Sequence, residues 1–223
     1  MKQYIKDEMS GLEYIPLEPG DTASFDCCCC GQCCRKIESS VPLESLDVFR
    51  IAKHLRKPIE DVIEEYTEVE MLIHNFPMLF LKTRGEANEC IFLKNNRCTI
   101  HDSKPRTCRM YPFSAGPGGD GGLEYIWAAK EHHMYMPGKL HVRDWMEAAL
   151  SPEDREFLQL EYDYAKAIGF LLGRLPKEID SDILREMLVY RYFAYDMSSN
   201  FIPQYKENMS MLINVLVRRI ERL

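Results

Sequence analysis

Residues 26–34 read DCCCCGQCC, so that six of the nine cysteines of the chain fall within eight positions. The three other cysteines follow later, and the last 115 residues hold none: Cys90, Cys98 and Cys108. Within the run, Cys27-x2-Cys30 has the spacing of a metal knuckle, in which a tight turn directs two sulfurs at one ion. Gly31 supplies the backbone freedom that such a turn needs. The run therefore predicts an irregular lobe organised around bound metal.

The distribution of the cysteines does not fit a disulfide framework. Such a framework scatters its cysteines to join distant loops, and adjacent cysteines pair poorly because a disulfide needs Cα atoms about 5.5 Å apart. Nine is also an odd count. The first twenty residues lack the apolar core of a signal peptide. We therefore expect a cytoplasmic protein whose thiols are reduced.

The second cysteine group is more widely spaced, as Cys90-x7-Cys98-x9-Cys108. Together the two groups supply seven well-placed thiols: Cys27, Cys30, Cys33, Cys34, Cys90, Cys98 and Cys108. Two closed four-cysteine sites would need eight ligands. Seven leave two alternatives, which are a thiolate shared between metal ions, or one closed centre beside a three-cysteine site with an open position. Zinc and iron, including an iron–sulfur cluster, are the expected metals.

A basic stretch accompanies the second group. Between residues 90 and 113 the charge is five minus one, or +4, in a chain of net charge −7: Lys94, Arg97, Lys104, Arg106 and Arg109 against Asp102. Cations near bound thiolates would lower their pKa and offset their charge. The alternative is a solvated basic loop that binds an acidic partner. The negative charge of the whole chain argues against nucleic-acid binding.

The rest of the sequence is typical of a soluble globular protein. Of its 223 residues, 46% are hydrophobic and 28% charged. No apolar run reaches the roughly 18 residues of a membrane span, so no membrane partner is expected. Apolar residues at helical spacing predict helices over 43–66, with Pro58 opening the second. Short apolar runs predict strands over 78–83 and 90–93, followed by a turn at 95–96.

The character of the sequence changes near residue 138. The glycine-rich stretch 115–122 predicts a flexible loop before it. Beyond it, helix starts are expected at Ser151-Pro152, at Asp180 or Ser181, and at Pro203. We predict a lead-in over 1–20, a cysteine-cluster metal-binding domain over 21–137 and a helical C-terminal region over 138–223. The fold class is α+β, an irregular cysteine-rich lobe with a small antiparallel sheet and helices, followed by a mainly helical region.

Three stretches carry a resemblance to a known family: Cys27-x2-Cys30-Gly31-x-Cys33-Cys34, then Cys90-Ile91-Phe92-Leu93, then Cys98-Thr99-Ile100-His101-x2-Lys104-Pro105-x2-Cys108-Arg109-x-Tyr111-Pro112. They resemble the YkgJ family of cysteine-cluster proteins, which carry a zinc- or iron-chelating domain. The resemblance implies ligand roles for the seven cysteines named above, and it extends distantly to flagellin lysine-N-methylases. Two departures are the extra thiols Cys28 and Cys29, and Lys104 where arginine is commoner.

Three classes of function follow. The first is a metal- or iron–sulfur-binding protein. The second is a metal-dependent protein lysine methyltransferase with a protein substrate, which rests on the resemblance alone. The third is a zinc-stabilised module that binds a protein partner. Colour separates iron–sulfur from zinc, and lysine methylation with S-adenosylmethionine separates the enzyme from both.

Other motifs add little to this choice. The bacterial ferredoxin pattern is excluded, because its fourth cysteine position holds Ile37. No catalytic triad, paired-carboxylate signature, phosphate-binding loop or dinucleotide fingerprint is present, so no catalytic residue is assigned. His101 is expected to pack beside the centre or donate to a thiolate rather than bind the metal. His132 and His133 are expected in the core or on the surface.

Overall fold

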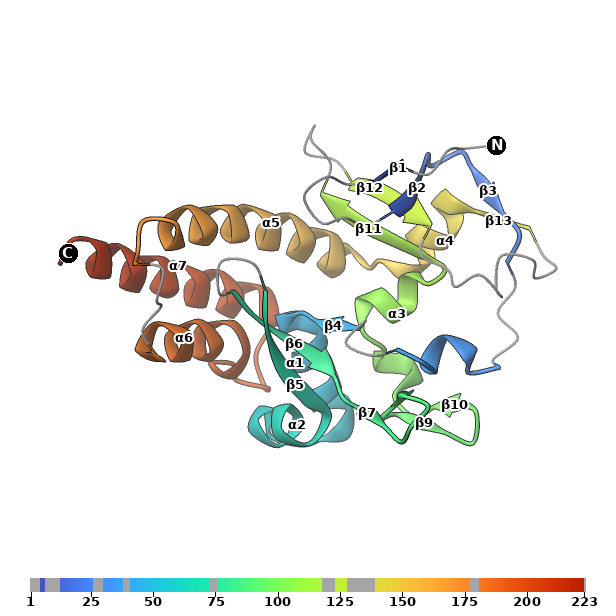
Figure 1. The fold of residues 1–223 in the computed structure, drawn as a ribbon, viewed down its shortest axis with the longest axis horizontal. Coiled ribbons are helices and arrows are strands. Elements are labelled where there is room, and N and C mark those ends of the chain that lie inside the picture. The colour runs from blue at the N-terminus through green and yellow to red at the C-terminus, as the bar shows by residue number, and fades with distance from the viewer. Residues whose placement is uncertain are drawn as a thin grey trace. The chain divides into compact units, whose positions relative to one another are not determined.

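The structure is a computed structural model, and it describes residues 5–6, 13–25, 30–37, 41–72, 76–117, 123–127, 139–176 and 181–222 (Figure 1). The helices are α1 (Ser45–Leu55), α2 (Ile59–Tyr66), α3 (Arg106–Met110), α4 (Val142–Ala149), α5 (Pro152–Leu172), α6 (Ser181–Leu188) and α7 (Phe201–Ile220), with the short helices η1 (Gln32–Cys34), η3 (His101–Ser103) and the π-helix η5 (Val189–Phe193). The strands are β1 (Ile5–Lys6), β2 (Glu13–Leu17), β3 (Thr22–Ala23), β4 (Pro42–Leu43), β5 (Thr67–Leu72), β6 (Phe76–Leu81), β7 (Thr83–Arg84), β8 (Glu89–Cys90), β9 (Leu93–Lys94), β10 (Arg97–Cys98), β11 (Phe113–Pro117), β12 (Leu123–Trp127) and β13 (Leu140–His141).

The predicted α+β class is confirmed, with small antiparallel sheets and helices in the N-terminal half and mainly helices after residue 141. The chain divides into two compact units, each built from two stretches of sequence. Unit 1 contains residues 1–33 and 106–159, and unit 2 contains residues 34–105 and 160–223. The domain boundary at residues 137–138 stays a prediction. No helix among the described residues is long and apolar enough to cross a membrane.

Unit 1 is built around a four-stranded antiparallel sheet with the order β1-β2-β12-β11. Its core gathers on one cluster of buried side chains from α3, β11, α4 and α5: Met110, Phe113, Ala115, Val142, Met146, Ala149, Leu150 and Leu158. A short pair of strands, β3 and β13, joins residues 22–23 to 140–141. This sheet and core therefore hold α3, which carries Cys108, against α4.

Two expectations about this sheet need correction. The segment expected as a loose lead-in contributes β1 and β2, and Pro16 of β2 pairs with Ile126. Proline within a strand weakens the local signal, and the partner strand lies far away in sequence. The loop expected over 115–122 begins later, because β11 continues through Pro117 opposite Leu123. Pairing with β12 overrides the local preference of Gly116 and Pro117, and residues 118–122 lie outside the described residues.

Unit 2 contains the sheet β4-β6-β5 and the helices predicted over 43–66. Helix α1 begins after Glu44, whose backbone N–H donates to the Asp47 carboxylate at 3.2 Å in a capping box. The buried face of α1 carries Val48, Ile51 and Ala52, which are at most 1% exposed. The sheet β4-β6-β5 and helix α1 together make the core of unit 2. The two hairpins that carry Cys90 and Cys98 fold against this core.

The C-terminal helices begin with α5, which runs through the boundary between the two units. The hydroxyl of Ser151 accepts a hydrogen bond from the Asp154 backbone N–H at 3.2 Å, so the predicted N-terminal cap is confirmed. Helix α6 begins at Ser181 as expected. It widens into the π-helix η5, which ends at Phe193.

Helix α7 begins at Phe201, two residues before the predicted start at Pro203. Proline is tolerated there because the first N–H groups of a helix have no partner within the helix. An apolar stripe of α7 is buried: Tyr205, Met209, Leu212 and Leu216 are each 0% exposed.

Buried polar groups connect α5, η5 and α7. Arg191 of η5 is 1% exposed and donates to a Glu161 carboxylate oxygen at 2.7 Å. The Tyr205 hydroxyl donates to the other oxygen of Glu161. Burial, reinforced by the charge of Glu161, raises the pKa of Tyr205. A buried charge is tolerated when it is paired with an opposite charge and the pair is hydrogen-bonded, whereas Arg191 or Glu161 without the other would be a costly unpaired charge.

Candidate metal centre

The first cysteine group is described from Cys30 onward, and Cys27, Cys28 and Cys29 lie outside the described residues. Gly31 has a φ of 71°, in the left-handed region that favours glycine, as expected for the tight turn. The short helix η1 follows and carries Cys33 and Cys34. Cys30 and Cys34 are half-buried, and Cys33 is exposed. The turn thus presents its cysteines at different depths.

The residues after Cys34 are bound to the second group by hydrogen bonds within unit 2. The guanidinium Nε of Arg35 donates to Glu89 Oε1 at 2.9 Å, and Arg35 also donates to Asn96 Oδ1 at 2.6 Å. The next two backbone N–H groups donate to the carbonyls of Ala87 and Asn88, each at 3.1 Å. Residues adjacent to Cys34 therefore contact residues just before Cys90 and Cys98.

Two small hairpins carry Cys90 and Cys98. In the first, Cys90 of β8 pairs with Thr83 of β7. In the second, Cys98 of β10 pairs with Leu93 of β9. The predicted turn at residues 95–96 is confirmed, with positive φ values of 50° and 61°. A two-residue loop with both φ values positive matches the right-handed twist of the strands, and asparagine tolerates that conformation.

Cys90 is 6% exposed, and backbone N–H groups that follow it in the chain donate to its sulfur. Burial raises the pKa of its thiol, hydrogen bonds from the backbone N–H groups of Phe92 and Leu93 oppose that rise, and the nearby Cys98 adds to it. Amides directed at a cysteine sulfur stabilise a thiolate, which is the form that binds metal. The knuckle geometry expected at Cys27–Cys30 therefore has a counterpart at Cys90.

Cys108 lies on α3 in unit 1, beside an aromatic cluster. Phe25 is 6% exposed, and its ring centroid lies 5.9 Å from that of Tyr111 and 5.9 Å from that of Trp145, edge to face in both cases. The Trp145 indole N–H donates to the carbonyl of Met110 at 3.1 Å. The residue two positions before Cys27 is therefore packed on the residue three positions after Cys108.

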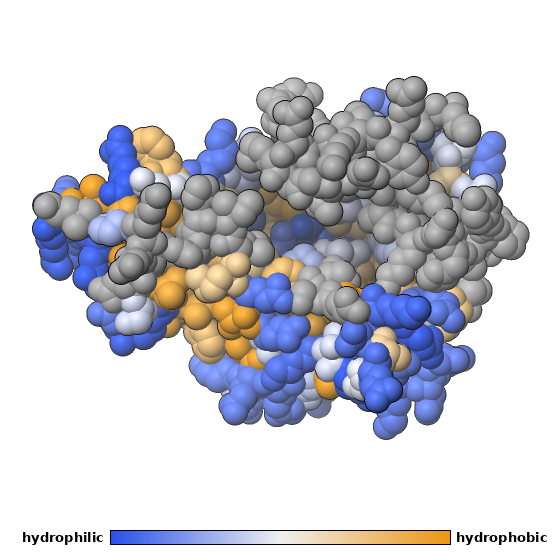
Figure 2. Space-filling model, in the orientation of Figure 1, coloured by the Kyte–Doolittle hydropathy of each residue, from blue (hydrophilic) through white to orange (hydrophobic). Residues whose placement is uncertain are grey.

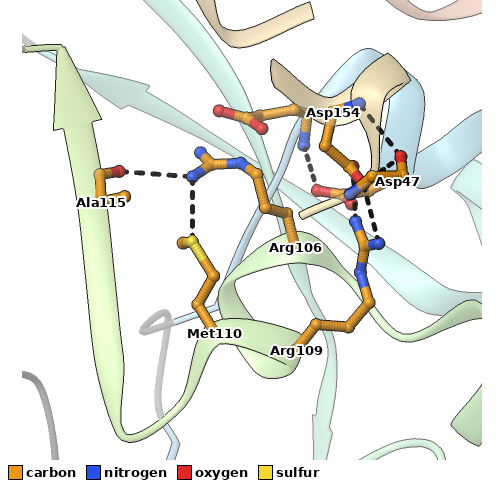
Figure 3. Close-up of polar contacts among 8 residues, drawn as sticks. Asp47, Arg106, Arg109, Met110, Ala115 and Asp154 are labelled. Atoms are coloured by element: carbon orange, nitrogen blue, oxygen red, sulfur yellow. Dashed lines mark hydrogen bonds and ion pairs between the residues drawn. The ribbon is translucent and has the colours of Figure 1, made fainter. Parts of the chain in front are cut away.

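The cations of α3 have partners other than thiolates (Figure 3). Arg109 forms a bidentate ion pair with Asp154, with N–O distances of 2.6 and 3.0 Å. The Asp154 side chain is 1% exposed. Arg106 donates to the carbonyl of Ala115 at 3.3 Å and contacts the sulfur of Met110. Arg109 therefore anchors α3 to α5, and the expectation that these cations lower the pKa of the thiolates stays a prediction.

Sequence reasoning missed the residues that hold the cysteine segments: Phe25, Arg35, Arg84, Glu89 and Asn96. The Arg84 guanidinium donates to the carbonyl of Leu93, and its charge partly opposes the rise in the pKa of Cys90 that burial causes. Lys94, Arg97 and His101 are exposed. The sequence offers no local signal for these contacts, because hydrogen-bonding pairs such as Arg35 and Glu89 are 54 positions apart.

The predicted ligands divide between the units. Cys34, Cys90 and Cys98 belong to unit 2, and Cys30, Cys33 and Cys108 belong to unit 1. In the described ranges, no three His, Cys, Asp or Glu side chains are arranged so that they could hold a metal ion. His132 and His133 lie outside those ranges.

A comparison with known families matches residues 26–138 to the CxxCxxCC family, described as "Putative zinc- or iron-chelating domain". The chain belongs to the CxxCxxCC family. The match covers both cysteine groups, the hairpins between them and α3. The protein thus carries a zinc- or iron-chelating cysteine-cluster domain.

An archaeal relative shares part of this CxxCxxCC chain. An uncharacterized protein of Methanocaldococcus jannaschii is 27% identical over 93 residues, which are 41% of this chain and 46% of the relative. The chain thus spans less than half the length of that curated relative. No solved structure matches the chain.

Proposed function

We propose that both cysteine groups bind one metal centre, of iron or zinc, and that its ligands come from Cys27, Cys30, Cys33, Cys34, Cys90, Cys98 and Cys108. The observation that carries this proposal is the hydrogen bonding of Arg35 to Glu89 and Asn96. It ties the end of the first cysteine group to the residues before Cys90 and Cys98.

A second anchor supports the same proposal from unit 1. Phe25 precedes the first group, and Tyr111 follows Cys108, and the two rings are in contact. Each end of the run from Cys27 to Cys34 is thus held, within its own unit, beside a segment that carries a later cysteine.

The donor chemistry fits either metal. Thiolates are the ligands of structural zinc and of iron–sulfur clusters, and both centres can be closed with cysteine alone. The spacing in the family name, CxxCxxCC, is matched by Cys27, Cys30, Cys33 and Cys34, which supports leaving Cys28 and Cys29 out of the ligand set. We propose that these two thiols are not ligands.

We assign roles at the centre to two cysteines from how far each is exposed to solvent. Cys90, the buried one among the described cysteines, is suited to a permanent ligand that loses its proton when metal binds. Cys33, which is exposed, is suited to the position where solvent or a further ligand reaches the centre. We favour metal binding over methyl transfer, because the cysteines supply metal ligands, whereas methyl transfer rests on the family resemblance alone.

The test is elemental analysis and an absorption spectrum of protein purified without oxygen. We expect bound iron with visible charge-transfer absorption, or bound zinc without colour. Substitution of Cys30, Cys33, Cys98 or Cys108 by Ser should lower the metal content per chain and the melting temperature together, since metal binding is largely folding free energy. Cys28→Ser and Cys29→Ser are the matched controls and should change neither. Metal content unchanged in all six variants would refute the proposal.

A further inference from the structure

Strand β5 forms one edge of the sheet in unit 2, since the strand order is β4-β6-β5. Its sequence is Thr-Glu-Val-Glu-Met-Leu. Two of its apolar side chains are unusually exposed, Val69 at 49% and Met71 at 48%. In Figure 2 apolar side chains gather over the region where Figure 1 draws β5 and β6, next to the hydrophilic surface of α2. An edge strand with exposed apolar groups is a template for another strand.

The register of β5 on β6 shows which backbone groups face outward. The Lys82 backbone N–H donates to the Tyr66 carbonyl at 2.9 Å, so that pair lies in a hydrogen-bonded position. Hydrogen-bonded positions alternate along an antiparallel pair. Thr67, Val69 and Met71 therefore direct their N–H and C=O groups away from β6. Pro77, which has no N–H to donate, lies opposite Met71, as this register requires.

The two faces of β5 differ in chemistry. Val69 and Met71 lie on the face of their cross-strand partners Leu79 and Pro77, which are both buried. Glu68 points to the other face, opposite Phe80. Residues 59–72 hold six acidic residues and no basic one: Glu60, Asp61, Glu64, Glu65, Glu68 and Glu70. Lys57 pairs with Glu65 at 2.5 Å, and Glu60, Asp61, Glu64 and Glu68 are exposed.

We propose that β5 binds an extended peptide segment of a partner protein in which basic and apolar residues alternate. The partner adds an antiparallel strand to β5, with its apolar side chains beside Val69 and Met71 and its lysine or arginine side chains beside Glu68. Backbone hydrogen bonds to Val69 and Met71 supply affinity, and alternation of side chains supplies selectivity. A second copy of β5 would place glutamates of both strands together, and like charges on neighbouring strands repel. This activity is separate from the metal centre.

Fluorescence anisotropy with the full-length protein tests the proposal. The probe is a labelled heptapeptide of alternating lysine and valine. Valine residues opposite Val69 and Met71 would direct their N–H groups at β5, whereas lysine N–H groups would point away. We expect N-methylation of the valine nitrogens to weaken binding by at least about tenfold. N-methylation of the backbone nitrogens of the lysine residues is the control and should leave affinity unchanged.

Substitutions on the protein complete the test. Glu68→Lys should weaken binding at least about fivefold, since it replaces attraction by repulsion, whereas Glu207→Gln on α7 removes one negative charge at a distance from β5 and should not. Equal binding of the two N-methylated peptides would show electrostatic attraction alone and would overturn the proposal. So would no binding of the unmodified peptide. Sedimentation showing a dimer that Val69→Lys dissociates would instead make a second copy the occupant.

Discussion

Arg35 donates a hydrogen bond to Glu89 at 2.9 Å, and so the residue after Cys34 is held by the residue before Cys90. The two side chains are 26% and 31% exposed, so the ion pair contributes little to global stability, on the order of 0–1 kcal/mol. Its value is geometric, because it restricts where the two neighbouring cysteines lie. A local contact of this kind acts on metal affinity more than on folding.

Arg35→Ala should therefore release metal faster without a comparable loss of stability. We expect the rate of metal transfer to a chelator to rise several-fold, with a melting temperature of the metal-free protein close to that of the wild type. Lys94→Ala removes an exposed cation from the hairpin that carries Cys98 and is the matched control. Equal chelator kinetics in the two variants would contradict the role assigned to Arg35.

Phe25→Ala tests the aromatic anchor in unit 1. The substitution empties a buried site between Tyr111 and Trp145, and we expect the free energy of unfolding to fall by about 3–5 kcal/mol in a denaturant titration. Phe170 is 63% exposed, so Phe170→Ala should change the free energy of unfolding by no more than about 0.5 kcal/mol. A Phe25 variant as stable as the Phe170 variant would mean that this ring contributes no packing energy.

Arg109→Ala should destabilise the protein because it leaves the buried Asp154 carboxylate without its cation. Breaking one partner of such a pair costs about 3–5 kcal/mol, and the remaining bonds from Ser151 to Asp154 favour the lower end. Arg185→Ala breaks an exposed pair with Asp182 and should cost under about 1 kcal/mol. Urea unfolding monitored by circular dichroism measures both. The ion pair is unimportant if the two variants unfold at the same midpoint.

Leu212→Asp places a charge in the buried stripe of α7, where Leu212 is 0% exposed. We expect loss of the folded state, seen as aggregation in size-exclusion chromatography and loss of the thermal transition, since an unpaired buried charge is strongly unfavourable. Met211 is the adjacent control, being 48% exposed, and Met211→Asp should remain folded. If both variants fold, the stripe is not the core of the helical region.

Removal of the metal should lower the melting temperature of the whole chain. Binding to the folded state alone stabilises it by mass action, so adding metal back should restore the transition. Calorimetry with and without chelator, followed by metal addition, measures this. Identical transitions in metal-loaded and chelated protein would show that the centre does not stabilise the fold.

Local sequence signals predicted much of the fold. The helices over 43–66, the cap at Ser151, the helix start at Ser181 and the asparagine turn before Cys98 are all present. Each depends on neighbours within a few residues, where spacing and turn chemistry leave a visible pattern. Strands β2 and β11 were not expected, because Pro16, Gly116 and Pro117 mask the local pattern and pairing with β12 compensates.

By itself, the sequence determined that nine cysteines form two groups, the first with metal-knuckle spacing, because ligand type and the turn at Gly31 are local properties. Only the tertiary structure decided which residues hold those groups in place. Arg35 with Glu89 and Phe25 with Tyr111 are contacts between distant positions. Tertiary structure also directed Arg109 to Asp154. A charge or a ring acquires its partner only when the chain has folded, so neither pairing leaves a periodic mark in the sequence.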